Sequence, residues 1–257
     1  MTPPIADHLL AADLVRSAGR LAWRMRTEGL SVDQKTSVSD VVTAADHAAE
    51  ELVVSRLRDA RPDDAIVGEE GTDHPGTSSR SWVIDPVDGT WNFVQGLSHW
   101  CSALALQDTS GVVLGAVHHP HDDHTWVGGP GLPTSRDGVP IEGLRDSRLA
   151  EIGVATYLHP TWFDDPAVAD PWRRAAGAAA TIRMLGSGSM DLVSVAEGRL
   201  GCWFQHSVPA WDWLPGQALV LGAGGAAEQV EVDGFVWSVA GRPTAVAEVV
   251  ARLSTVG

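Results

Sequence analysis

Cysteine and lysine are scarce in this sequence of 257 residues. Its two cysteines, Cys101 and Cys202, lie in apolar stretches, so we expect two buried free thiols rather than a disulfide framework. Lys35 is the only lysine, and 18 basic residues oppose 33 acidic ones, a formal net charge of −15. This acidity argues against nucleic acid as a partner. It does not exclude a phosphorylated substrate, because bound divalent metal ions reverse the local charge.

Long apolar runs are also missing. No stretch is long enough to span a bilayer, so we expect no membrane partner. The first residues, MTPPIADHLLAADLV, lack a basic segment followed by a long apolar core, so we do not expect a signal peptide. These absences predict a soluble, cytoplasmic protein. Hydrophobic residues make up 44% of the chain, which is ordinary for a globular fold.

The spacing of apolar residues predicts the secondary structure. Helices are expected over residues 5–27 and 44–60, the second with Thr43 as its N-cap. Strands are expected at 65–67, 82–84, 100–108 and 111–118, a polar loop at 72–80, and a loop rich in glycine and proline at 128–138. After residue 150 strands (151–155, 181–184, 200–204, 226–230, 235–238) alternate with helices (167–179, 189–197, 212–222, 244–254). Alternation of this kind indicates layers of an α/β fold.

Acidic residues stand at several junctions between an apolar element and a loop. They are Asp46, Glu69 and Glu70 in VGEEG, Asp85 and Asp88 in DPVDGT, and Asp212 in AWDW. Loop ends at the edge of a sheet are where functional sites are usually built. The carboxylate and carbonyl oxygens of DPVDGT suit Mg²⁺. Taken alone, the motif fits equally well an ordinary turn with two aspartate caps.

The residue after this turn, Thr90, can cap a following helix. The free N–H groups at that helix start would then face the same spot as the two aspartates and suit a phosphate. Gly89 permits a positive φ or the close approach of a ligand.

Four stretches together resemble the signature regions of the inositol monophosphatase family. They occur in the family's order and span roughly residues 8–250: Lys35–Asp46, Gly68-Glu69-Glu70, Asp85-Pro86-Val87-Asp88-Gly89-Thr90-x-Asn92-Phe93, and Trp211-Asp212-x-x-x-Gly216 followed by Ala223-Gly224-Gly225. The resemblance implies a layered αβαβα sandwich. It also implies a single domain over residues 1–257, with an N-terminal half of about 1–145 and a C-terminal half of about 146–257, and a homodimer.

The resemblance also implies a metal site with two or three Mg²⁺ ions. One ion would be held by Glu69, Asp85 and the carbonyl of Val87, and a second by Asp85, Asp88 and Asp212. A third, weaker ion would lie near Glu69.

By the same resemblance, Asp46 and Thr90 would orient and deprotonate the attacking water, with Glu69 in the catalytic set. The N–H groups of Gly89 and Thr90 would bind the phosphate, and Glu70 would support the site from just outside.

The substrate's alcohol would lie near Ser187, Gly188 and Gln205. Ser187 and Gly188 equally fit a plain capped helix start. Gln205 stands where animal members carry a glutamate, so the charge expected there is missing. Trp91 departs from the small or polar residue usual after this motif, and we expect it to pack rather than to contact substrate.

A histidine-rich stretch, residues 118–124, carries metal-binding side-chain types but no recognised zinc spacing, so a solvated turn is favoured.

We expect Mg²⁺-dependent hydrolysis of a small phosphate monoester, with myo-inositol 1-phosphate or a similar polyol phosphate as leading substrate. Histidinol phosphate is the alternative within the class. A non-catalytic metal-binding or dimerisation module with the same fold is the alternative of another class.

Overall fold

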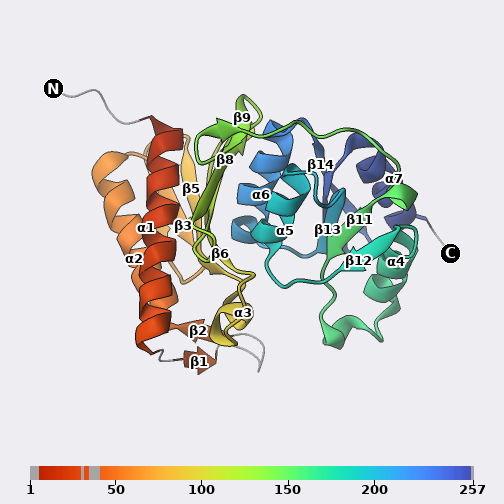
Figure 1. The fold of residues 1–257 in the computed structure, drawn as a ribbon, viewed down its shortest axis with the longest axis horizontal. Helices are drawn as coiled ribbons and strands as arrows, with labels where there is room; N and C mark the ends of the chain where they lie inside the picture. The colour runs from red at the N-terminus through yellow and green to blue at the C-terminus, as the bar shows by residue number, and fades with distance from the viewer. Residues whose placement is uncertain (1–5, 30–31, 35–40, 256–257) are drawn as a thin grey trace.

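Helices and sheets alternate across the protein in the order αβαβα (Figure 1). The structure is a computed structural model that describes residues 6–29, 32–34 and 41–255. Lys35 and most of the polar segment before Asp46 fall outside these residues. The predicted layered α/β sandwich is confirmed.

The first outer layer consists of α1 (Asp7–Glu28) and α2 (Ala44–Ala60), which cover one face of an eight-stranded sheet. In spatial order its strands are β10 (Val139–Pro140), β9 (Leu132–Arg136), β8 (His124–Gly129), β7 (Gly111–His119), β6 (Cys101–Asp108), β5 (Ser81–Asp88), β3 (Ala65–Gly68) and β4 (Asp73–His74). Among the described strands of this sheet, only β3 and β5 pair in parallel. A separate pair, β1 (Val32–Gln34) and β2 (Val41–Thr43), precedes α2, and α3 (Thr90–Val94) follows β5.

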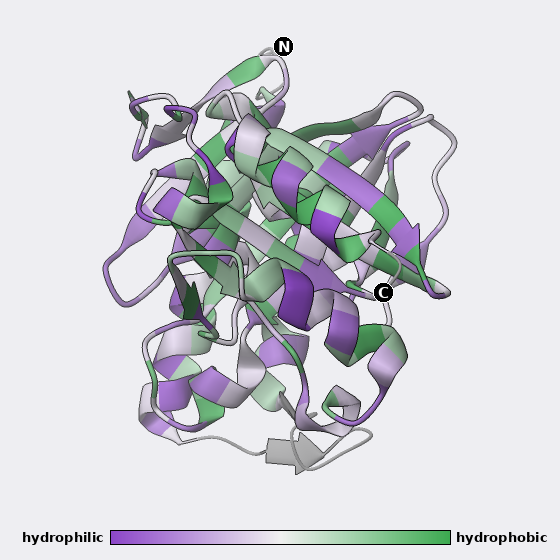
Figure 2. Ribbon diagram, turned by 90° about the vertical axis from the view of Figure 1, so that its right-hand side faces the viewer, coloured by the Kyte–Doolittle hydropathy of each residue, from purple (hydrophilic) through white to green (hydrophobic). Residues whose placement is uncertain are grey.

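The middle layer consists of α5 (Gly188–Ala196) and α6 (Ala210–Gly222), which lie between the two sheets (Figure 1). The second sheet has the order β12 (Thr181–Arg183), β11 (Gly153–Thr156), β13 (Cys202–His206), β15 (Phe235–Gly241) and β14 (Ala226–Val232). Helices α4 (Pro166–Ala176) and α7 (Pro243–Leu253) cover its outer face, and two short 3₁₀ helices lie at Leu149–Glu151 and Pro160–Trp162. Figure 2 shows the molecule from the side that α4 and α7 cover. Hydrophilic and hydrophobic residues lie side by side along these helices, as expected for helices that bury one face.

Separate hydrophobic cores fill the spaces between the layers. Leu14, Leu57 and Ile84 belong to the core between the first helices and the large sheet. A second core lies around α5 and α6 and includes Trp203 and Trp213, whose rings stack with centroids 5.7 Å apart. The cores hold both sheets against the middle helices, and residues of β5 and of β13 line the same cavity.

Most predicted elements are confirmed within a few residues. Helix α2 has the predicted bounds, and Thr43 caps it by accepting from the N–H groups of Ala45 and Asp46. The loops predicted at 72–80 and 128–138 are partly wrong, since they contain β4, the end of β8, and β9. Those strands pair locally in hairpins, where short polar or glycine-rich stretches leave little apolar alternation to detect.

Cys101 and Cys202 are buried and free, as predicted. None of the helices within the described ranges is long and apolar enough to cross a membrane.

Candidate active site

The DPVDGT turn lies at the end of β5, which continues beyond the predicted end at Asp85 to Asp88. Its pairing with β6 is irregular between these two residues. Gly89 then adopts a left-handed conformation with φ 92° and ψ 41°. A Cβ at this position would lie 3.1 Å from the Gly186 carbonyl oxygen and 3.1 Å from Ser187 Cβ. The backbone conformation therefore favours glycine strongly, and the close approach of the neighbouring chain adds to this preference.

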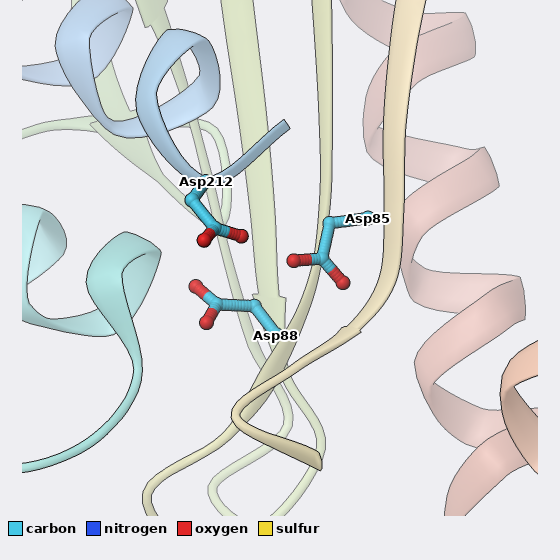
Figure 3. Close-up of side chains that lie close together, drawn as sticks. All are labelled: Asp85, Asp88 and Asp212. Carbon is cyan, nitrogen blue, oxygen red and sulfur yellow. The ribbon is translucent and has the colours of Figure 1, made fainter. Parts of the chain in front are cut away.

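Three carboxylates converge at this strand end. Asp85 and Asp88 come from β5, and Asp212 comes from the first turn of α6 (Figure 3). A carboxylate oxygen from each lies within 4.8 Å of the others, and Figure 3 shows the three groups pointing toward one another. Oxygen donors this close can hold a hard divalent cation. The residues therefore fit the metal that the family resemblance implies.

The electrostatics of the cluster favour a cation. Burial raises the pKa of Asp85 well above its ordinary value, and repulsion from Glu69, Asp88 and Asp212 raises it further. Burial also raises the pKa of Asp88, although the hydrogen bond from the Ser189 N–H opposes this shift. Without a cation the buried cluster resists ionisation, so a bound metal would stabilise its charged form.

Asp46 and Thr90 form a second polar group beside the cluster. The Thr90 hydroxyl lies 3.2 Å from Asp46 Oδ1 and 2.9 Å from the Val87 carbonyl oxygen. Burial raises the pKa of Asp46 to about 6, despite the hydrogen bonds that its carboxylate accepts from Thr43. The expected capping role of Thr90 is wrong, because Gly89 is the N-cap of α3 and Thr90 is the first helical residue. Its hydroxyl is thereby directed to Asp46 and Val87.

Glu69 and Glu70 lie on the turn after β3. Glu69 lines the cavity and repels Asp85, while the Glu70 carboxylate lies 4.0 Å from His47 Nδ1 and contributes to the raised pKa of Asp46. Of these two acids, only Glu69 is among the residues that line the cavity.

A cavity of about 440 Å³ opens beside the cluster. The predicted site residues that line it are Glu69, Asp85, Val87, Asp88, Gly89, Thr90, Ser187, Gly188, Gln205 and Asp212. Ser187 also caps α5, accepting from the Met190 N–H, so the capped-helix alternative is confirmed, while its contact with substrate stays a prediction. None of the described residues lining the cavity is a lysine or an arginine.

Sequence reasoning did not identify three polar residues of this region. Asn92 lines the cavity and donates to the carbonyls of His99 and Leu185, at 2.8 and 2.7 Å. His99 pairs with the buried Asp191, which also lines the cavity, at 2.9 Å. These contacts join α3 to the start of α5. Of the three, only Asn92 belongs to a sequence motif, which could have indicated it.

Two minor expectations are corrected. Trp91 is 42% exposed and lines the cavity instead of packing in the core.

His118 and His119 are buried at the end of β7, so the solvated turn is limited to residues between β7 and β8. His118 Nδ1 hydrogen-bonds the Thr125 hydroxyl and His119 Nε2 hydrogen-bonds the Ser98 carbonyl, so one ring nitrogen of each buried histidine has a partner.

Comparisons with known proteins identify the family of this chain. Residues 7–252 match the sequence profile of the Inositol monophosphatase family. Nus factor SuhB of Pseudomonas aeruginosa is 33% identical over 224 residues, covering 84% of this chain and 82% of the relative. Inositol-1-monophosphatase of Rhizobium meliloti is 34% identical over 199 residues, covering 76% and 74%. Extragenic suppressor protein suhB from Bartonella henselae has a TM-score of 0.86 at 24% identity, covering 96% of this chain and 98% of that one.

The fold, the acidic cavity and these relatives define the class as a phosphatase superfamily with a cluster able to bind metal. The chain belongs to the inositol monophosphatase family, as its four motifs predict. The Bartonella structure supports the fold alone.

Proposed function

We propose that the protein is a Mg²⁺-dependent phosphomonoesterase. The observation that carries this proposal is the convergence of Asp85, Asp88 and Asp212 within 4.8 Å at the wall of a cavity. Buried like charges at this distance need a compensating cation. Carboxylate and carbonyl oxygens favour Mg²⁺ over softer metals.

In this proposal Glu69, Asp85 and the Val87 carbonyl hold one Mg²⁺, and Asp85, Asp88 and Asp212 hold another. A third ion near Glu69 would make three per site. All five residues line the same cavity, which supports this grouping. When bound, the ions would neutralise charge on the phosphate and make the attacking water more acidic.

The chain's own residues would orient the water and take its proton. The Thr90 hydroxyl, fixed between Asp46 and the Val87 carbonyl, would position the water. Asp46 would accept the proton, since a pKa of about 6 suits a general base near neutral pH. The N–H groups of Gly89 and Thr90 would donate to the phosphate, and Glu70 would support this arrangement from behind.

The alcohol portion of the substrate would lie against Ser187, Gly188 and Gln205. We favour myo-inositol 1-phosphate or a similar polyol phosphate, because these residues offer hydroxyl, backbone and amide hydrogen bonds. The absence of lysine and arginine among the described lining residues argues against a second phosphate. Histidinol phosphate is the alternative, because Trp91 and Tyr157 present aromatic rings to the same cavity.

A non-catalytic role is the second candidate function. The similarity to proteins named Nus factor SuhB favours it. The presence of every acid that the metal mechanism needs favours catalysis. We also propose that residues 1–257 form one domain and that two copies associate as a homodimer.

Phosphate release from a panel of inositol, histidinol, sugar and nucleotide monoesters tests the proposal. We expect hydrolysis with Mg²⁺ and none after treatment with EDTA. Activity that survives the chelator would contradict the metal mechanism, and inactivity on the whole panel would favour the non-catalytic role.

A further inference from the structure

Glu50 is a buried acid to which the proposed chemistry assigns no role. Glu50 lies on the buried face of α2 and is 4% exposed. Asp46 lies one helical turn earlier, and residues four apart share a face of a helix. Helix α2 therefore presents two buried carboxylates to the site region, and only Asp46 reaches Thr90.

The Glu50 carboxylate binds the turn that carries Glu69. Its Oε2 accepts from the Glu70 N–H at 2.9 Å. Its Oε1 accepts from the Thr72 N–H at 3.2 Å and from the Thr72 hydroxyl at 2.7 Å. Both oxygens are thus used, and each donor comes from the residues just after Glu69. Hydrogen bonds to a carboxylate are stronger than those between neutral groups.

Two further contacts fix the turn. The Gly68 N–H donates to the Thr72 carbonyl at 2.8 Å, and the Glu69 N–H donates to the Ile84 carbonyl at 3.2 Å. A Cβ at Gly68 would overlap the Glu50 carboxylate, so glycine at this position allows the carboxylate to reach the turn. The turn is therefore bonded to β5 through the Glu69 N–H and to α2 through Glu70 and Thr72.

We propose that Glu50 is a positioning residue that holds the turn of residues 68–72 so that Glu69 faces Asp85. This inference rests on the proposed function, because it treats Glu69 as a metal ligand. Without the Glu50 carboxylate, the N–H groups of Glu70 and Thr72 lose a charged acceptor, and the turn loses the three hydrogen bonds by which Glu50 ties it to α2. Partners that orient metal ligands contribute about 10- to 100-fold to metal affinity or activity.

The test compares Glu50→Gln with wild type and with Glu51→Gln. Glu51 is the next residue of α2 and is exposed, so the control makes the same chemical change away from the turn. Three quantities are measured: the Mg²⁺ concentration for half-maximal hydrolysis of myo-inositol 1-phosphate, the Mn²⁺ dissociation constant by calorimetry, and amide hydrogen exchange at Glu70 and Thr72.

For Glu50→Gln we expect both metal constants to rise about 10- to 100-fold, faster exchange at the two amides, and recovery of turnover at high Mg²⁺. Glu51→Gln should match wild type. Unchanged metal constants in Glu50→Gln, with or without a lower melting temperature, would overturn the positioning role while leaving the phosphatase proposal intact.

A second variant covers the case in which Glu50→Gln does not fold. Thr72→Val removes one donor to the carboxylate and keeps the side-chain shape, so we expect a smaller rise in the same metal constants. Unchanged constants in this variant would count against the inference. A wild-type protein that binds Mn²⁺ without hydrolysing any ester would contradict the proposed function alone, because calorimetry still tests Glu50. A wild-type protein that does neither would overturn both.

Discussion

The Thr90 hydroxyl lies 3.2 Å from Asp46 Oδ1, although the two residues are 44 positions apart in the chain. The contact joins the start of α2 to the turn after β5. If the pair acts as one unit on the attacking water, removing either member should remove most of its contribution.

We therefore expect Asp46→Asn and Thr90→Val each to lower kcat by about 10²- to 10⁴-fold. The double variant should lose no more than the worse single variant. Thr90→Ser is the control, because it keeps the hydroxyl. Steady-state kinetics on one ester gives kcat for all four variants. Additive losses in the double variant would mean that the two residues act separately.

Asp88→Asn should lower turnover by orders of magnitude and leave the fold intact. The change removes one negative charge from a buried cluster that repels itself, while an amide oxygen can still accept from the Ser189 N–H. Melting temperatures measured in EDTA and in Mg²⁺ check that the variant is folded and compare its stabilisation by the metal with that of wild type. Wild type should gain stability with Mg²⁺ and the variant should gain much less. An unfolded variant would show instead that the acid is structural.

Gln205→Glu should change the choice of substrate more than the rate. Gln205 lines the cavity, and a carboxylate there would accept hydrogen bonds from substrate hydroxyls. We expect kcat/KM for polyol phosphates to rise relative to that for histidinol phosphate. Gln229→Glu makes the same change at an exposed residue of β14 and serves as control. The same preference in both variants would remove Gln205 from substrate recognition.

Asp191 should make the metal-free protein less stable as pH rises. Burial raises its pKa to about 6 from an ordinary value of 3.8, although the His99 partner opposes the shift. The folded state therefore binds the proton more tightly than the unfolded chain. The resulting stabilisation is complete below pH 3.8, is lost as pH rises through 6, and amounts to about 3 kcal/mol.

Asp191→Asn removes the titrating group and should not lose stability in this way. The unfolding free energy of the variant should therefore rise relative to that of wild type between pH 4 and pH 7. Urea unfolding in EDTA measures it. A difference that stays constant with pH would contradict the prediction.

The sequence predicted the elements with strong local signals and missed those that depend on partners. The apolar periodicity and the Thr43 cap defined α2 completely, since a capping box forms from neighbouring residues. The strand β9 was missed because its own sequence shows little alternation of apolar and polar residues. Its pairing with β8 stabilises the strand instead. The prediction that Trp91 packs was wrong because the exposed fraction of a side chain depends on which distant residues pack against it. The local sequence does not show these residues.

Local sequence by itself brought Asp85, Asp88 and Gly89 together, because a proline, a glycine and two acids follow one another within a few residues and glycine permits the left-handed backbone found at Gly89. Tertiary structure alone decided which distant groups complete the site. His99 meets Asp191 across 92 positions, and Glu50 meets the Glu70 N–H across 20. Such contacts depend on how the buried layers pack, and packing is a property of the whole chain.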